Sequence, residues 1–462
     1  MRLYDTLRRR TVDFAPLEPG HVRMYNCGPT VYRRSHLGNY RAYATADLLR
    51  RTFEFLGWRV TQVMNITDVG HLTEDDAADG RGEDRLQKEA QARKLDPWEI
   101  AREVEGWFHE DRRTLRILDA HRYPRATDHI PEMIAMIEAL VKSGHAYVAE
   151  GSVYFAVGSF PRYGALSGNT VEKLDAGASG RVEDRAEKRS PHDFALWKRD
   201  PKHLMQWDSP WGRGFPGWHI ECSAMSRKYL GDTFDLHTGG RDNIFPHHEC
   251  EIAQSESVTG KPFVRHWAHC GWLTLGGEKM AKRAGRIYTV PELVEQGYAG
   301  GDIRLLLLKQ HYRAPLPFRT ELLDEAKEIR KRFNNFVQQD RPPGPPDPKA
   351  VEGARARFRA ALEDDVNTSE ALAVLHELMT AVNRTGAGAK EAVAFLREAD
   401  RVFAILDEAV EASDAEIERL MADREAARKS RDFKKADAIR DELLRRGIEL
   451  LDTPQGTRWR RK

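Results

Sequence analysis

Near the N-terminus, the hydrophobic pattern alternates between short apolar runs and one longer stretch with helical spacing. Val22 to Asn26 is short and rich in β-prone residues, and it ends at Cys27. Apolar residues then recur every three or four positions up to Gly57, as on one face of a helix: Tyr43, Ala46, Leu49, Phe53 and Leu56. A second apolar run over 60–66 follows. This order predicts a strand, helix and strand of a parallel sheet, whose ligands bind at the carboxyl ends of the strands.

Two polar stretches interrupt the pattern further along the chain. Residues 70–93 are charged and contain glycine, which predicts a solvated excursion rather than core. A β-rich patch around 151–164 precedes a second stretch rich in glycine and charge, 177–190. We therefore expect residues 120–204 to be an insertion between two halves of a nucleotide-binding sheet.

From Leu322 onward the spacing becomes helical, with apolar side chains on one face, and this predicts a separate helical module. A proline-rich segment, 341–346, interrupts it. The last helix pair begins with a capping box at Ser413 to Glu416 and ends at Gly447. A strand-like IELLDT and a basic end, TRWRRK, follow.

Composition narrows the class of protein. A chain of 462 residues predicts several domains. The 73 basic and 72 acidic residues nearly cancel, so any surface that binds nucleic acid must be local. We expect a cytoplasmic protein without a membrane partner, because the sequence has neither an apolar stretch of the ~18 residues that a membrane span needs nor a secretory signal. Four scattered cysteines indicate reduced thiols rather than disulfides.

Two segments carry residues suited to binding a nucleoside triphosphate. His36, Gly38 and Asn39 lie between the first strand and its helix, where backbone amides and the helix dipole favour phosphate. Far downstream, Lys279 and Lys282 lie in a loop rich in glycine, and their charges could stabilise a pentacoordinate phosphorus as pyrophosphate leaves. Either segment alone is equally consistent with an ordinary helix start or a charged turn.

A second constellation suits a metal ion. His247 and Glu251 are four residues apart on a helix that Pro246 could begin, which places both side chains on one face. Cys27, at the end of a strand, and Cys222 could add two thiolates to a tetrahedral zinc site. His248 points about 100° away around that helix, and the remaining thiols, Cys250 and Cys270, are expected in the core.

Taken together, HLGN and KMAKR resemble the two signature motifs of class I aminoacyl-tRNA synthetases. Five further blocks make the chain similar, over nearly its whole length, to the cysteinyl-tRNA synthetase family: CGPTVY, NITDV, GWHIECSAM, FPHHECEIAQS and DTPQGTRWRR. The resemblance implies a ligase that activates cysteine with ATP and Mg²⁺ and attaches it to tRNA-Cys. One departure stands out, since Ala281 and Arg283 replace the two serines usual in the second motif.

The resemblance also assigns residues to roles. It implies one Zn²⁺ per chain on Cys27, Cys222, His247 and Glu251, and an amino-acid pocket lined by Trp218 and His237. The ATP site would comprise His36, Gly38, Asn39, Asp242 and Lys282, with catalysis by His36, Lys279 and Lys282.

The implied fold class is α/β, with a Rossmann-like parallel-sheet catalytic domain, a connective insertion, a C-terminal helical bundle and a small anticodon-binding module. The expected boundaries are 1–119 and 205–255 for the two halves of the catalytic domain, 120–204 for the insertion, 256–318 for the stem-contact region with the second motif, 319–412 for the bundle and 413–462 for the anticodon-binding module. The family resemblance favours a monomer.

The C-terminal tail suits contact with an RNA loop, because cations for phosphate contact surround an aromatic ring for base stacking: Arg458, Trp459, Arg460, Arg461 and Lys462. Two rivals stay open on sequence alone. One is a ligase that joins cysteine to an amino sugar, which would not need the C-terminal module, and the other is a non-catalytic RNA-binding paralogue.

Overall fold

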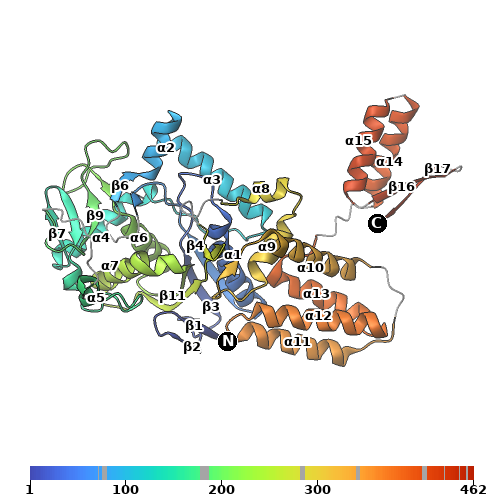
Figure 1. Ribbon diagram of the computed structural model, residues 1–462, viewed down its shortest axis with the longest axis horizontal. Coiled ribbons are helices and arrows are strands. Elements are labelled where there is room, and N and C mark those ends of the chain that lie inside the picture. The colour runs from blue at the N-terminus through green and yellow to red at the C-terminus, as the bar shows by residue number, and fades with distance from the viewer. Residues whose placement is uncertain are drawn as a thin grey trace. The chain divides into compact units, whose positions relative to one another are not determined.

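The computed structural model describes residues 1–70, 72–74, 81–176, 187–280, 287–339, 344–407, 414–430, 432–446, 448–453 and 456–461. The chain divides into two compact units, Met1–Ile405 and Leu406–Lys462. Figure 1 shows the larger unit from blue to orange and the smaller one in red. Each unit is described by itself.

A four-stranded parallel sheet forms the centre of the larger unit. Its order is β12-β11-β3-β4, from β12 (Val264–Cys270), β11 (Phe234–Gly240), β3 (His21–Asn26) and β4 (Arg59–Met64). Helix α1 (Leu37–Phe55) joins β3 to β4 and contacts all four strands. The predicted strand–helix–strand unit is therefore confirmed. The strand order reverses between β3 and β11, and the crevice outside the carboxyl ends of two such strands is where open α/β sheets bind ligands.

Two helices on the path from β4 to β12 bring further residues to this edge. Helix α6 (Trp218–Leu230) contacts β3 and packs against α7 (Glu249–Thr259). Short helical turns at 241–243 and 244–248 connect β11 to α7. Most of α6 and the first half of α7 are buried, so polar side chains on them are committed to internal contacts.

The insertion after α3 (Pro97–Thr114) contains α4 (Ile130–Lys142), α5 (Val171–Ala176) and a second, antiparallel sheet. That sheet has the order β10-β9-β8-β7, from β10 (Phe215–Pro216), β9 (Phe194–Lys198), β8 (Ser152–Phe155) and β7 (Ala146–Ala149). Of the β-rich patch expected near 151–164, only β8 is a strand; β7 lies before it, and a short helical turn at 157–159 and further turns follow. Through β10 the sheet continues to Pro216, directly before α6.

The expectation of a solvated excursion over 70–93 was wrong for its second half. Strand β5 (Leu72–Glu74) pairs with β6 (Arg81–Asp84), and α2 (Arg85–Arg93) follows. Leu86 and Ala90 of α2 are only 4% and 2% exposed, and α2 packs against α3. Two apolar residues four apart give a short helix enough of a buried face, although charged neighbours hide them in the sequence. Residues 71 and 75–80 lie outside the described part.

The remaining elements of the larger unit are two small sheets and a helical bundle. Strand β1 (Arg2–Asp5) pairs with β2 (Arg10–Asp13), and β13 (Leu273–Leu275) lies between β14 (Glu278–Lys279) and β15 (Leu316–Pro317). After α8 (Val290–Glu295) and α9 (Gly300–Leu308), the predicted helical module consists of α10 (Thr320–Gln338), α11 (Pro348–Glu363), α12 (Thr368–Thr385) and α13 (Ala389–Phe403). Part of the proline-rich segment, 341–343, lies outside the described residues.

The smaller unit packs a helix pair and a hairpin around its own core. Helices α14 (Asp414–Lys429) and α15 (Phe433–Arg445) precede the antiparallel strands β16 (Ile448–Thr453) and β17 (Gly456–Arg461). Trp459 packs against this core, which consists of Ile417, Ile439, Leu443 and Ile448. The ring therefore contributes to the fold of the unit, and because it is only partly buried, its stacking on an RNA base stays a prediction. Both Ser413 and Gly447 lie outside the described residues. None of the described helices is long and apolar enough to cross a membrane.

A buried ion pair ties the bundle to α1. Arg304 on α9 lies 2.5 Å from the Asp47 carboxylate on α1 and also donates to the carbonyls of Leu115 and Phe403. Both charged side chains are at most 1% exposed. Because α1 also carries the HLGN residues at its first turn, this pair fixes the helix that positions them.

We predict that Asp47→Ala destabilises the protein by about 3–5 kcal/mol, because it leaves the Arg304 guanidinium buried without its counter-ion. Denaturant unfolding followed by circular dichroism measures this. Glu377→Ala is the matched control, since Glu377 pairs with Arg357 on the exposed side of the bundle and its loss should change nothing measurable. An Asp47→Ala variant that unfolds at the wild-type denaturant concentration would show that the pair does not hold α1 in place.

Candidate metal and nucleotide site

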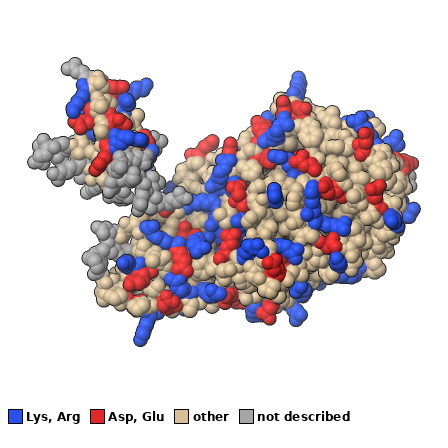
Figure 2. All heavy atoms as spheres, turned by 180° about the vertical axis from the view of Figure 1, so that it is seen from behind, with Lys and Arg blue, Asp and Glu red and all other residues tan. Residues whose placement is uncertain are grey.

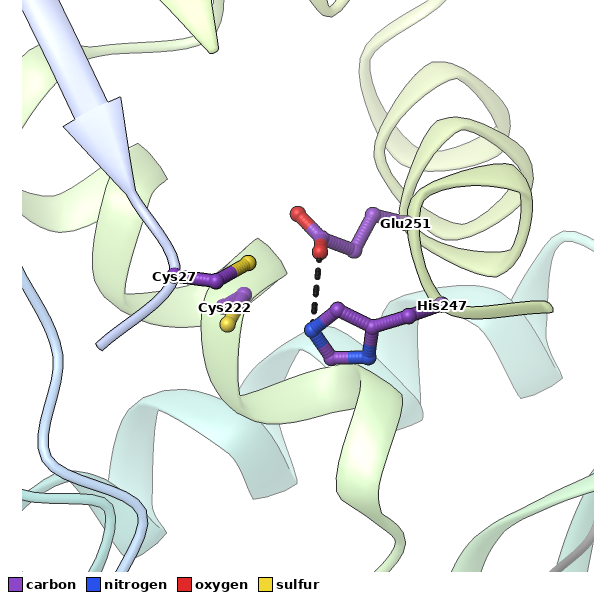
Figure 3. A group of neighbouring side chains, drawn as sticks. All are labelled: Cys27, Cys222, His247 and Glu251. Atoms are coloured by element: carbon purple, nitrogen blue, oxygen red, sulfur yellow. Dashed lines mark ion pairs between the residues drawn. The ribbon is translucent and has the colours of Figure 1, made fainter. Parts of the chain in front are cut away.

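Four potential metal ligands converge near the carboxyl end of β3. Cys27 directly follows β3, Cys222 lies on α6, and His247 and Glu251 come from the turn before α7 and from α7 itself (Figure 3). One donor atom from each lies within 4.8 Å of all the others. In a tetrahedral zinc site, bonds of about 2.0–2.3 Å separate the ligand atoms by roughly 3.3–3.8 Å. The group therefore requires only a small contraction to hold a metal ion.

The geometry of Glu251 indicates what its two oxygens do. Its Oε1 lies 3.1 Å from Nε2 of His247, one helical turn earlier, yet makes no hydrogen bond with the described residues. The other oxygen, Oε2, lies 2.9 Å from Nε2 of the buried His237. Glu251 thus has one oxygen held by a neighbour and one directed at the other donors, which is how metal-binding carboxylates are commonly oriented.

Burial makes the site unfavourable for the charged forms of its own donors. It raises the pKa of Cys27 and, with the added effect of the neighbouring Cys27, raises that of Cys222 well above its ordinary value. Burial also raises the pKa of Glu251, against the opposing effect of His237. A cation at this point would stabilise both thiolates and the carboxylate at once. Donor chemistry and electrostatics therefore fit a divalent metal.

Further histidines surround these donors. Nδ1 of His219 lies 2.9 Å from Nδ1 of His247, so His247 can donate there and keep Nε2 for a metal. Nε2 of His248 lies 3.1 Å from the Cys27 sulfur, and its Nδ1 lies 2.8 Å from Nε2 of His269. The sequence assigned no role to His219 or His269. The only feature of the sequence that could have pointed to these two residues is the number of histidines in the WHIEC, PHHEC and RHWAHC segments.

A second combination of donors is geometrically possible, namely Cys27, His237, His248 and Glu251. It shares Cys27 and Glu251 with the first, so the two cannot be filled independently. We favour the first because in the second Glu251 Oε2 is already hydrogen-bonded to His237, and because two sulfur donors bind a soft metal better than one. If the first set held the metal, His237 would contact it only through Glu251, and His248 only through Cys27.

The two residues expected in the amino-acid pocket lie next to the metal donors. The Trp218 ring stacks on the His247 ring, with centroids 4.3 Å apart, and is only partly buried. His237 is fully buried against Glu251. Cys250 and Cys270 are buried, as expected for core thiols, and the Cys250 sulfur lies 3.5 Å from the Tyr163 hydroxyl.

The two signature segments meet at the first turn of α1. His36 caps α1, and its backbone N–H donates to the Asn39 side chain. A Cβ placed on Gly38 would lie 3.6 Å from the Met280 carbonyl, so the second segment passes directly over the first. Lys279 lies 3.0 Å from the Asp242 carboxylate in an ion pair that is about half exposed. Lys282, with Ala281 and Arg283, lies outside the described residues.

Positive charge is concentrated at this turn. Burial, followed by the charges of Arg33 and Lys279, lowers the pKa of His36 to about 4. The imidazole is therefore neutral at neutral pH, and it can donate one hydrogen bond and accept another. An anion bound there would meet the helix N-terminus, Lys279 and Arg33 together.

Comparison with known proteins identifies the family. Residues 13–328 match the catalytic domain of the class I (C) tRNA synthetases, 357–409 match the DALR domain, and 411–460 match the anticodon-binding domain of cysteinyl-tRNA ligase. The chain is 47% identical to the cysteine–tRNA ligase of Alkalilimnicola ehrlichii, over all of both chains. The chain belongs to the cysteine–tRNA ligase family. It is therefore a class I aminoacyl-tRNA synthetase, and the amino-sugar ligase is not favoured.

Other relatives support the same family. The cysteine–tRNA ligase of Symbiobacterium thermophilum is 45% identical over 100% of this chain and 99% of its own, and one from Thermus thermophilus is 45% identical over 99% and 98%. Among solved structures, Mycobacterium tuberculosis methionyl-tRNA synthetase bound to methionyl adenylate superposes with a TM-score of 0.57 at 13% identity, over 83% of this chain and 92% of its own. That likeness confirms the class I fold.

We predict that the His36 imidazole stays neutral until the pH approaches 4, well below the range of an exposed histidine. Side-chain NMR of ¹⁵N-labelled histidine, with His36→Gln to assign the signal, measures this. Lys279→Ala should raise the pKa of His36, because it removes a nearby positive charge. A midpoint near that of a solvent-exposed histidine would contradict the burial of the ring and its position among cations.

Proposed function

We propose that this enzyme activates L-cysteine with Mg-ATP to form cysteinyl adenylate and transfers the cysteinyl group to the 3′ end of tRNA-Cys. The observation that carries the proposal is the convergence of two thiols, an imidazole and a carboxylate beside the HLGN turn, in a chain of this family. In activation, a carboxylate oxygen of cysteine attacks the α-phosphorus and pyrophosphate leaves. The terminal ribose hydroxyl of the tRNA then attacks the acyl carbon, loses its proton, and displaces AMP.

We further propose that the metal is one Zn²⁺ on Cys27, Cys222, His247 and Glu251. When bound, zinc would supply a soft Lewis acid that holds the substrate's sulfur as thiolate and binds the hydroxyl of serine only weakly. Shape alone separates such near-isosteres by roughly a hundredfold. Trp218, stacked on His247, and His237, through Glu251, would set the shape of the pocket.

The chain's own residues would bind ATP by charge and position. We assign the phosphates to His36, to the backbone near Gly38 and Asn39, and to Lys279 and Lys282, and the ribose to Asp242. The ion pair between Lys279 and Asp242 supports this, because it places the two side chains 3.0 Å apart, close enough to contact neighbouring parts of one nucleotide. Little acid–base chemistry is needed, so positioning and charge stabilisation would carry the rate.

The tRNA would be bound by local surfaces. Lys and Arg are interspersed with Asp and Glu over the visible face of the larger unit (Figure 2), so this face does not present a single basic field. We assign contact with the anticodon to the module at 413–462, which follows the helical bundle at 319–412. We also propose that the enzyme is a monomer and acts in the cytoplasm. Membership of the cysteine–tRNA ligase family argues against the non-catalytic paralogue that the loss of both serines in KMAKR suggested, and cysteine-dependent pyrophosphate exchange tests this directly.

We predict that the wild-type enzyme contains about one zinc per chain and that Cys222→Ala loses most of it, together with cysteine-dependent pyrophosphate exchange, because one of the four ligands is removed. Metal analysis after gel filtration and the exchange assay measure the two effects. Cys250→Ala is the matched control, since Cys250 is equally buried and is not among the donors. A metal-free Cys222→Ala enzyme that still activated cysteine and rejected serine would refute this basis for selectivity.

We predict that a chain ending at Asp407 retains cysteine-dependent pyrophosphate exchange but charges tRNA poorly. The apparent affinity for tRNA should fall by about tenfold or more, and the salt dependence of binding should weaken with it, since lost phosphate contacts no longer release counterions. Charging kinetics at several salt concentrations test this. An acceptor-stem minihelix is the control, because both chains should charge it equally. Equal charging of full tRNA would show that the smaller unit does not bind the anticodon.

A further inference from the structure

The loop that carries Cys27 is attached to the end of β4. The Gly28 N–H donates to the Asn65 side-chain oxygen at 2.9 Å. Backbone bonds of 3.0 Å join Val31 N–H to the Thr67 carbonyl and Thr67 N–H to the Pro29 carbonyl. A Cβ on Gly28 would lie only 1.8 Å from the Asn65 carbonyl oxygen, so the contact requires glycine. The position of the Cys27 loop is thus set by residues 65–67.

Side chains continue this connection to helix α6. Asn65 Nδ2 donates to the Thr67 hydroxyl at 3.0 Å, and that hydroxyl lies 3.0 Å from Glu221 Oε2. The donor and acceptor of each bond are fixed. The Asn65 side-chain oxygen accepts from Gly28, so its amide nitrogen donates to Thr67, and the Thr67 hydroxyl donates its single proton to Glu221. All three side chains belong to residues no more than 3% exposed, so a broken link would leave a polar group buried without a partner.

Each end of the chain of bonds lies one residue from a thiol. Gly28 follows Cys27, and Glu221 precedes Cys222 on α6. The Glu221 carboxyl is also confined, because a Cβ on Gly70 would lie 3.2 Å from its Oε1 and 2.7 Å from the Pro216 carbonyl oxygen. The backbone therefore packs directly over this carboxyl. The distance between the Cys27 loop and the N-terminal part of α6, which carries Cys222, therefore depends on the hydrogen bonds through Asn65 and Thr67 as well as on packing.

We propose that Asn65, Thr67 and Glu221 are positioning residues that set the distance between the Cys27 and Cys222 sulfurs and so the affinity of the site for its metal. The inference rests on the proposed zinc site. It assigns these three residues to metal binding through the backbone of the ligands, without contact to the metal. Partners of metal ligands typically contribute about 10–100-fold to metal affinity.

The test is Co²⁺ binding to the full-length apoenzyme, followed by the thiolate-to-cobalt absorption band, which reports on both sulfurs. Thr67→Val and Glu221→Ala should each weaken Co²⁺ binding by about 10–100-fold and reduce the band. Thr67→Ser and Glu221→Gln should stay near the wild type, because serine keeps the hydroxyl and glutamine keeps an oxygen to accept from it. Thr45→Val is the control for loss of a buried hydroxyl, since the Thr45 hydroxyl donates to the Arg41 carbonyl within α1 and takes no part in the bonds between Gly28 and Glu221.

The outcomes separate this inference from the proposed function. If the wild type binds one Co²⁺ through two thiolates and only Thr67→Val and Glu221→Ala are impaired, the inference holds. If the wild type binds metal and both variants match it in affinity and absorption, the positioning role is overturned while the zinc site stands. If the wild type shows no thiolate band, the zinc proposal fails and the inference falls with it. Thr45→Val losses as large as those of Thr67→Val would assign the effect to general destabilisation and overturn the role.

Discussion

The convergence of two thiols, an imidazole and a carboxylate in the protein interior is the constraint on which this site depends. Burial raises the pKa of Cys27, Cys222 and Glu251, so the neutral forms of these three groups are favoured. A divalent cation bound among these groups would stabilise their charged forms, so the buried cluster would favour metal binding. The donors come from three places in the chain, so their distances must be set by the surrounding structure.

The parallel sheet supplies that structure. Cys27 leaves β3 at the point where the strand order reverses, and α6 and α7 bring the other donors to the same edge. Helix α1 starts beside it, and its position is fixed from behind by the Asp47–Arg304 pair. Cys27 and the HLGN turn thus lie at one edge because both follow β3, and α6 and α7 bring the other donors there.

Periodicity and local spacing made part of this predictable from sequence. The strand–helix–strand unit follows from apolar repeats, and the pairing of His247 with Glu251 follows from an interval of four residues. Cys27 and Cys222 are 195 positions apart, and only the family resemblance joined them to that pair. The His219, His237, His248 and His269 contacts could not be foreseen, because they depend on tertiary packing between α6, β11, α7 and β12.

Burial was missed in the sequence where charged neighbours concealed it. Leu86 and Ala90 form the packed face of α2 within a stretch whose composition is typical of solvated loops. Trp459, surrounded by arginines, packs into the core of the smaller unit through a hairpin that pairs it with Leu450. In both cases the local composition is polar, and the deciding interaction is with an element elsewhere in the chain.

The central claim is that the thiol of cysteine is recognised by a zinc ion held on two cysteine sulfurs. X-ray absorption at the zinc edge of the full-length enzyme tests it most directly, because sulfur and lighter ligands are distinguished by distance. The metal should have two sulfur neighbours, from Cys27 and Cys222, in the enzyme alone. Cysteine should add a third sulfur, and serine should leave the spectrum unchanged. A sulfur number that is the same with and without cysteine would contradict recognition of the thiol by the metal.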